Sequence, residues 1–257
     1  MCLIIFSFKE DSSSNASFPG SLVLVANRDE YYERPTKNIH WWEEENIILA
    51  GKDLRAGGTW LGISADGRFG AITNYKEILE QENCNSRGEL VTNFLSSKGR
   101  SAEDFIKEIK ENNYAGFNLL LGDKAGIHYF SNRSQQVGPV QPGIHVIGNL
   151  LLDSKTSKSL RAKGGFKELI ESGPREKDYF KFMRDDLGDL SDLDTEGFKR
   201  NEHEEIPYRF IKSRVYGTRC TTVLTIDKKG NYQVTEQSYS KEGKKMEKIS
   251  FKFSMDS

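Results

Sequence analysis

Two early runs of consecutive apolar residues limit the folds open to this chain. The first run covers residues 2–8 and the second covers residues 21–26, and a polar loop that ends in Pro19-Gly20 separates them. A strand with one face in water alternates apolar and polar residues, whereas both runs are apolar on successive residues. We therefore expect two strands that are covered on both faces, inside a stack of layers.

Turn residues and apolar periodicity predict the other elements. Asp66-Gly67 supplies the turn of a hairpin, and Ser101 with Asp104 forms the N-cap of a helix and its third-position acid. The predicted strands are 40–42, 47–50, 59–63, 69–74, 117–121, 127–130, 144–148, 221–226, 232–238 and 248–253, and the predicted helices are 88–95, 101–111, 159–170 and 178–187. Residues 188–205 are acidic and polar with little periodicity, which indicates a mobile loop or an irregular helical segment.

The succession of strands, helices and strands again predicts an α+β fold. Two antiparallel sheets packed between helices fit this order, although the order alone also fits other α+β arrangements. The chain has 257 residues and no linker-like stretch, so we expect one domain over residues 1–257.

Charge and hydropathy argue against two classes of partner. The chain has 37 basic and 38 acidic residues and a net charge of −1, so no global attraction to nucleic acid or to an anionic membrane is expected. The apolar run at residues 3–6 follows no basic region and is too short for a signal peptide or a membrane span. We expect a cytoplasmic protein without a transmembrane segment.

The cysteines and histidines lack the spacing of a disulfide framework or a metal site. The number of thiols is odd, no Cys-x-x-Cys occurs, and no two imidazoles stand at metal-ligand spacing. Covalent haem attachment is excluded because no Cys-x-x-Cys-His is present, whereas noncovalent haem stays open. These residues are Cys2, Cys84, Cys220, His40, His128, His145 and His203.

The start of the chain provides a nucleophile. Aminopeptidases remove Met1 when the next side chain is small, so the mature protein should begin with Cys2. An α-amino group has a pKa of roughly 7.7–8.0 and a thiol a pKa of roughly 8.5, so the amine can act as a base for its own thiol. We expect Cys2 to face polar groups at nearby strand ends across one cleft.

Four polar residues, Asn27-Arg28-Asp29-Glu30, follow the second apolar run and either form a turn or belong to a site. Together with Met1-Cys2 and Arg34-Pro35, they resemble the NRDE family of transport and Golgi organisation proteins. Further stretches agree along the whole chain: 57–64, Thr73-Asn74-Tyr75, 87–91, 116–119 and 216–223.

This resemblance implies a fold and a set of residue roles. The NRDE family is similar to the N-terminal nucleophile (Ntn) hydrolases, which implies a four-layer αββα sandwich. The implied nucleophile is Cys2, the carboxylate that orients its amine is Asp29, the oxyanion donors are Asn74 and Asn149, and Arg219 supports the nucleophile. The sequence departs from the hydrolases at one position, where Ala26 replaces an arginine.

Structural interpretations of the same residues remain open. Asn74 and Asn149 also suit turns at strand ends, and Arg219 also suits an ion pair with a carboxylate such as Asp29. Gly57-Gly58, before Trp60, favours a tight turn over a phosphate-binding loop, because the Gly-x-Gly-x-x-Gly spacing is absent.

Two functions of different classes are consistent with these features. One is an amidohydrolase that cleaves a non-peptide C–N bond of an N-acyl amide through Cys2 and requires no cofactor. The other is a non-catalytic carrier, for which the family resemblance implies haem as a transported ligand or an acyl-coenzyme A or other lipid. In the carrier Arg28 meets an anionic group of the ligand. The residues expected to bind a ligand are Asn27, Arg28, Glu30 and Trp60.

Overall fold

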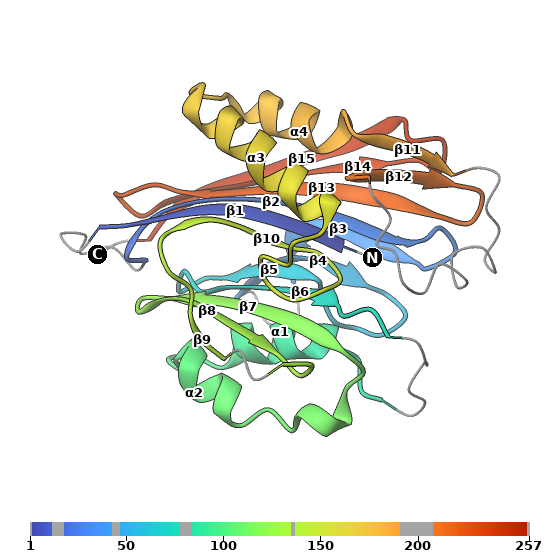
Figure 1. Ribbon diagram of the computed structural model, residues 1–257. Coiled ribbons are helices and arrows are strands. Elements are labelled where there is room, and N and C mark those ends of the chain that lie inside the picture. The colour runs from blue at the N-terminus through green and yellow to red at the C-terminus, as the bar shows by residue number, and fades with distance from the viewer. Residues whose placement is uncertain are drawn as a thin grey trace.

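The computed structural model describes residues 2–11, 18–42, 47–77, 84–134, 137–190 and 208–255, with residues 189 and 190 described by backbone alone. In these residues two β-sheets lie face to face and helices cover their outer faces (Figure 1). One sheet is covered by α3 (Ser157–Glu171) and α4 (Glu176–Arg184), and the other by α1 (Gly88–Ser96) and α2 (Ala102–Lys107). This four-layer αββα sandwich confirms the predicted α+β fold class.

The first sheet contains eight strands within the described residues. Its main order is β10-β1-β2-β13-β12-β11, and β14 pairs with β13 and carries β15 on its other side. All neighbours are antiparallel apart from β11 and β12, which are parallel. The strands are β1 (Cys2–Glu10), β2 (Gly20–Tyr31), β10 (Gly143–Ile147), β11 (Leu187–Leu190), β12 (Phe210–Ser213), β13 (Tyr216–Ile226), β14 (Asn231–Tyr239) and β15 (Lys245–Ser254).

The second sheet is an antiparallel meander in which each strand pairs with the next strand along the chain, in the order β3-β4-β5-β6-β7-β8-β9. The predicted hairpin at Asp66-Gly67 joins β5 to β6, and Gly67 has a φ of 85°, which a residue without a Cβ adopts readily. The strands are β3 (Thr36–Trp41), β4 (Ile48–Asp53), β5 (Leu61–Ser64), β6 (Phe69–Asn74), β7 (Phe117–Asp123), β8 (Gly126–Ser131) and β9 (Val137–Pro139).

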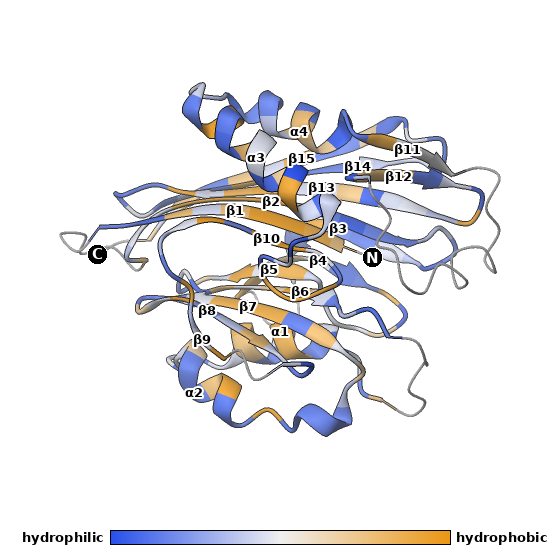
Figure 2. Cartoon of the chain, in the orientation of Figure 1, coloured by the Kyte–Doolittle hydropathy of each residue, from blue (hydrophilic) through white to orange (hydrophobic). Residues whose placement is uncertain are grey.

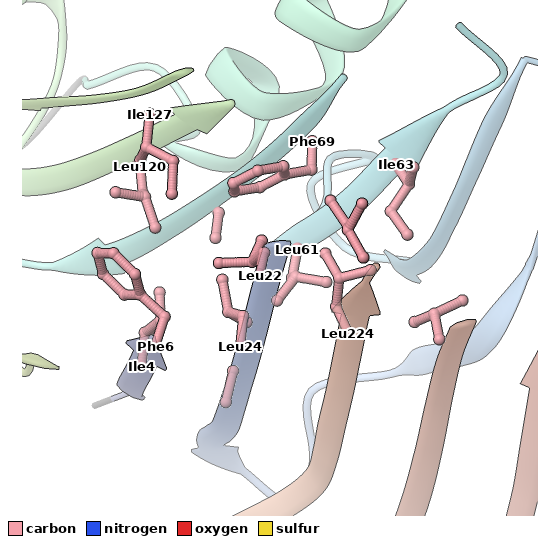
Figure 3. Close-up of a cluster of buried hydrophobic side chains, with 14 of the residues drawn as sticks. Ile4, Phe6, Leu22, Leu24, Leu61, Ile63, Phe69, Leu120, Ile127 and Leu224 are labelled. Atoms are coloured by element: carbon pink, nitrogen blue, oxygen red, sulfur yellow. The ribbon is translucent and has the colours of Figure 1, made fainter. Parts of the chain in front are cut away.

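The main core lies between the two sheets. Figure 3 shows Ile4, Phe6 and Leu24 of the first sheet pointing toward Phe69 and Leu120 of the second. All five side chains are at most 2% exposed. Full burial of one such side chain stabilises a fold by roughly 1.5–3 kcal/mol, so this interface holds the two sheets together.

Strand β1 is covered on both faces, as its apolar run predicted. Ile4 and Phe6 face the second sheet, whereas Leu3 and Ile5 pack with Phe166 of α3 in a separate cluster. Figure 2 shows this strand as apolar along most of its visible length. Because both faces are fixed by packing, the position of Cys2 at the start of the strand is also fixed.

Several predicted boundaries differ from the structure, among them those of helices α4 and α2. The helix α4 ends at Arg184, not at residue 187, and residues 187–190 form β11, so the irregular segment predicted from residue 188 begins as a strand. Residues 187–190 form a strand because they pair with β12, which lies 23 residues further along the chain. The local sequence pattern of residues 187–190 does not predict this pairing. The rest of that segment, residues 191–205, lies outside the described residues. Helix α2 is also shorter than residues 101–111 and is followed by a 3₁₀ turn at Glu111–Asn113.

None of the helices in the described residues combines the length and the apolar character needed to cross a membrane.

Candidate functional site

A cavity of about 420 Å³ lies where β1 and β2 of the first sheet meet the edge of the second sheet. Six of the predicted site residues contribute to its wall. Most of the other residues come from segments 55–60 and 84–88, and the rest are Arg34, Asp53, Ile72 and Ala115. The predicted residues in the wall are Cys2, Arg28, Asp29, Glu30, Trp60 and Asn74.

Cys2 is the first residue of β1, and the register of the sheet sets its neighbours. Cys2 pairs with Arg28 of β2, and Arg28 pairs in turn with Cys220 of β13. Burial raises the pKa of the Cys2 thiol, and the negative charge of Asp29 also raises it. The charge of the amino terminus and a hydrogen bond from the backbone of Asp29 lower it, but the effect of burial is larger. The thiol is therefore protonated at neutral pH and needs a base in order to act as a nucleophile.

Asp29 lies one residue beyond the partner of Cys2, so its carboxylate is beside the start of β1. The side chain is 2% exposed, and its Oδ1 accepts a hydrogen bond of 2.6 Å from Thr218 Oγ1. Burial raises the pKa of Asp29, and the charge of the amino terminus, the charge of Lys158 and the Thr218 hydrogen bond lower it. A carboxylate in this place can orient an amine at the start of the chain.

Arg28 points from β2 toward the second sheet and is already bound there. Its guanidinium donates to Asp53 Oδ2 at 3.0 Å and to Thr36 Oγ1 at 3.1 Å, and it stacks over the Trp60 ring at 4.3 Å. Arg34 Nε donates to the same Asp53 oxygen at 2.6 Å. The cavity wall thus contains a partly buried Arg–Asp–Arg cluster, in which the charge of Arg28 is compensated before any ligand binds.

Asp53 and Glu30 are the anions of this cluster. Burial acts to raise the pKa of Asp53, but hydrogen bonds from Arg34 and the backbone of Ala56 and the charges of Arg34 and Arg28 hold it below its usual value. Glu30 Oε2 lies 3.8 Å from Arg34 Nε and 4.0 Å from an Arg28 nitrogen. Glu30 therefore lines the cavity as a further partner of the arginines.

Arg219 occupies a β-bulge. Thr218 pairs with Asp29 and Cys220 with Arg28, so Arg219 is the extra residue of β13. Its Nη1 donates to the backbone carbonyls of residues 31, 32 and 34 at 2.9, 3.3 and 3.2 Å. These contacts are neither the predicted support of Cys2 nor a carboxylate pair, and Arg219 is not among the described residues that line the cavity. It fixes the turn between β2 and β3.

The two asparagines assigned to the oxyanion occupy different places. Asn74 is exposed at the end of β6 and lines the cavity. Asn149 is buried, does not belong to the described cavity wall, and donates from Nδ2 to the Asn74 carbonyl at 2.8 Å. The structure therefore places Asn74 where a substrate could reach it, and Asn149 behind it.

Asn27 lies on the opposite face of β2 from Arg28. Its Nδ2 donates to the carbonyl of Arg209 at 2.8 Å and to that of Met183 at 3.3 Å, and its Oδ1 accepts from Thr221 Oγ1 at 2.6 Å. The side chain joins the sheet to α4 and is not brought into the cavity with the other residues predicted to bind a ligand.

The Gly57-Gly58 pair forms a tight turn at the cavity edge. Gly57 has a φ of 78° and donates to the Asp53 carbonyl, and a Cβ on Gly58 would stand 2.5 Å from the backbone of Gly88. The small residues thus let the loop pack against the start of α1.

The sequence analysis assigns no individual role to several residues of the site. Arg87 lines the cavity just before α1 and donates to the Gly116 carbonyl at 3.1 Å. Burial lowers the pKa of Arg87, and the charges of Glu77 and Cys2 oppose that effect. The tertiary structure alone brings three further polar residues to the site: Asp53, Lys158 and Thr218. Among the described residues no cluster of three or more His, Cys, Asp or Glu side chains could hold a metal ion.

The fold and the site define a layered α+β protein with a cysteine at the start of a central strand and a cavity beside it. The family model described as Transport and Golgi organisation 2 matches residues 1–241. The chain is 34% identical to a Transport and Golgi organization protein 2 homolog of Bos taurus over 93% of each chain, and 31% identical to a Transport and Golgi organization 2 homolog of Mus musculus over the full length of both. The chain therefore belongs to the Transport and Golgi organisation 2 family, as the NRDE resemblance predicted.

A solved structure is also similar. A mutant of a conjugated bile acid hydrolase from Clostridium perfringens matches with a TM-score of 0.46 and 9% identity, over 98% of this chain and 97% of that one.

Proposed function

We propose that the protein is an N-terminal cysteine hydrolase that cleaves a non-peptide carbon–nitrogen bond by acyl transfer through Cys2. One observation carries the proposal: Cys2, Asp29 and Asn74 line the same cavity. A nucleophile, a carboxylate that can orient its amine and a donor for an oxyanion are the groups that such a reaction needs.

The reaction follows from these groups. Once Met1 is removed, the α-amine of Cys2 takes the thiol proton, and the thiolate attacks the amide carbonyl to form a tetrahedral intermediate. The C–N bond then breaks, and the ammonium returns the proton to the leaving amine. Water hydrolyses the remaining thioester, which releases the carboxylic acid and restores the thiol.

The side chains of the wall favour an acyl substrate with an anionic group. The described wall contains four arginines, Arg28, Arg34, Arg55 and Arg87, against the three acids Asp29, Glu30 and Asp53. Two of the arginines are held by Asp53. Arg87, and Arg55 with its 3.8 Å contact to the exposed Glu33, are then the groups best placed to pair with a carboxylate or phosphate. The cavity of about 420 Å³ is within the size range of small-molecule sites.

The same arginines support a second function, that of a carrier for an anionic ligand such as haem or an acyl-coenzyme A. In a carrier the thiol forms no covalent bond, so Cys2 contributes little to affinity. Arg87→Met should then weaken binding through the loss of one charged hydrogen bond, about 1.5–3 kcal/mol, while Cys2→Ala should leave it unchanged. The two functions therefore differ in the role of Cys2.

The test is turnover of a panel of N-acyl amides with anionic head groups, using protein whose intact mass shows the loss of Met1. We expect Cys2→Ala to abolish turnover and Cys84→Ala to retain it. Cys84 is a matched control because it lines the same cavity. Retention of Met1, or equal rates in Cys2→Ala and wild type, would contradict the hydrolase and leave the carrier.

A further inference from the structure

Lys158 is a buried cation with no hydrogen-bonding partner in the described part of the chain. Its side chain is 2% exposed, and its Nζ finds no donor or acceptor partner among the described residues. A charged group taken out of water is costly unless an opposite charge compensates it. The fold must therefore place an anion near this ammonium.

The helix that carries Lys158 cannot provide that compensation. Lys158 lies in the first turn of α3, two residues after the N-cap Thr156. The backbone dipoles of a helix place positive charge at this end, where they disfavour a cation. Helix α3 packs on β1 and β10, so it covers the outer face of the sheet that carries Cys2 and Asp29.

Asp29 is an anion whose charge interacts with this ammonium, although no hydrogen bond joins the two groups. The positive charge of Lys158 acts on the Asp29 carboxylate and lowers its pKa against the larger effect of burial. Asp29 also shares the face of β2 with Asn27, whose amide contacts α4, so its side chain is on the helix-covered side of the sheet.

Other charged and polar groups near Asp29 come from each neighbouring strand. Cys2 and the amino terminus belong to the β1 side, and Glu30 is the next residue of β2. From β13, the hydroxyl of Thr218 donates to the carboxylate and that of Tyr216 donates to the backbone carbonyl. Besides the amino terminus, Lys158 is the group of this set that brings a positive charge to Asp29.

We propose that Lys158 is a positioning residue of the Cys2 site, whose ammonium acts as the standing counter-ion of Asp29 and so favours the neutral form of the mature α-amine. Two cations beside one carboxylate repel each other, which disfavours protonation of the amine. This inference rests on the proposed function, in which the amine is the base.

The test is the pH dependence of acylation of the Cys2 α-amine by acetic anhydride, measured by peptide mapping on protein that lacks Met1. Lys158→Met removes the positive charge, so the midpoint of the rate profile should rise by about one pH unit. Lys158→Arg restores the charge and should return the midpoint toward that of wild type. Lys167→Met is the matched control on the same helix, because the Lys167 side chain is 66% exposed, and it should leave the midpoint unchanged.

Acylation of the amine needs no substrate of the enzyme, so a failure of this inference is distinguishable from a failure of the proposed hydrolase. An unchanged midpoint in folded Lys158→Met would overturn the role of Lys158. If that variant does not fold, Lys158→Met combined with Asp29→Asn removes both charges of the pair. Recovery of folding in the double variant supports the pairing, and continued failure to fold contradicts it.

Discussion

Thr218 donates a hydrogen bond of 2.6 Å to the carboxylate of Asp29, across 189 residues of sequence. The same hydroxyl accepts from the backbone N–H of Ile211 at 2.9 Å. Thr218 thus joins β12 and β13 to the strand that carries Asp29, and it fixes one oxygen of a buried carboxylate.

Replacement of Thr218 by valine keeps the shape of the side chain and removes both hydrogen bonds. Because Asp29 and the Ile211 N–H are buried, we expect the free energy of unfolding to fall by about 1–3 kcal/mol. Urea denaturation at neutral pH measures this change. Thr218→Ser, which keeps the hydroxyl, is the control; equal losses in the two variants would show that the methyl group, not the hydroxyl, stabilises this site.

Asp29 and Asp53 should give opposite pH dependences of stability. The pKa of Asp29 is raised in the folded protein, so its contribution is fully present below its unfolded pKa and is lost as pH rises through the folded pKa. The pKa of Asp53 is lowered, so its contribution is present above the unfolded pKa and is lost as pH falls through the folded pKa.

The stability of Asp29→Asn relative to wild type should therefore increase between about pH 3 and pH 7, while that of Asp53→Asn should decrease. Urea denaturation of the three proteins across this range provides the comparison. Parallel curves for the two variants would mean that the environments of the two carboxylates are not distinct.

Arg219 should contribute to stability and not to the reactivity of Cys2. Arg219→Ala removes the donors to three backbone carbonyls and should lower the free energy of unfolding by about 1.5–3 kcal/mol. Arg55→Ala is a suitable control, because the Arg55 side chain is 54% exposed and should change stability little. A variant of Arg219 with normal stability and a shifted pH profile of Cys2 alkylation would restore the role implied by the family resemblance.

The cysteines should differ in their alkylation. Burial raises the pKa of both Cys2 and Cys220, but Cys2 lines the cavity whereas Cys220 is 4% exposed within β13. We expect labelling of Cys2 to increase with rising pH and Cys220 to react after unfolding alone. Peptide mapping after brief exposure to iodoacetamide, with and without urea, measures both. Labelling of Cys220 in the folded protein would show that β13 opens.

Local sequence patterns were sufficient to predict the strands that are buried on both faces. The apolar runs of β1 and β2 record burial directly, and the Asp66-Gly67 turn records the hairpin between β5 and β6. Strand β11 was missed because its stability depends on pairing with β12, and such a pairing leaves no period in its own four residues.

The site likewise contains residues that the sequence predicts and residues that only the tertiary structure brings together. Cys2, Asp29 and Asn74 were predicted together because each stands at a strand end in a sequence that resembles a known family. Thr218 and Lys158 were not predicted, because their relation to Asp29 depends on the strand order β1-β2-β13 and on the docking of α3. The role assigned to Arg219 ignored the bulge that directs its side chain to the β2–β3 turn.

The most direct test of the proposed hydrolase is the trapping of an acyl-enzyme. Protein without Met1 is mixed with an N-acyl amide, quenched in acid and measured by intact mass and peptide mapping. The proposal predicts one acyl group on the Cys2 peptide of wild type and of Cys84→Ala, and none in Cys2→Ala. Binding of the amide with no adduct in any of the three proteins, at every quench time, would contradict acyl transfer through Cys2.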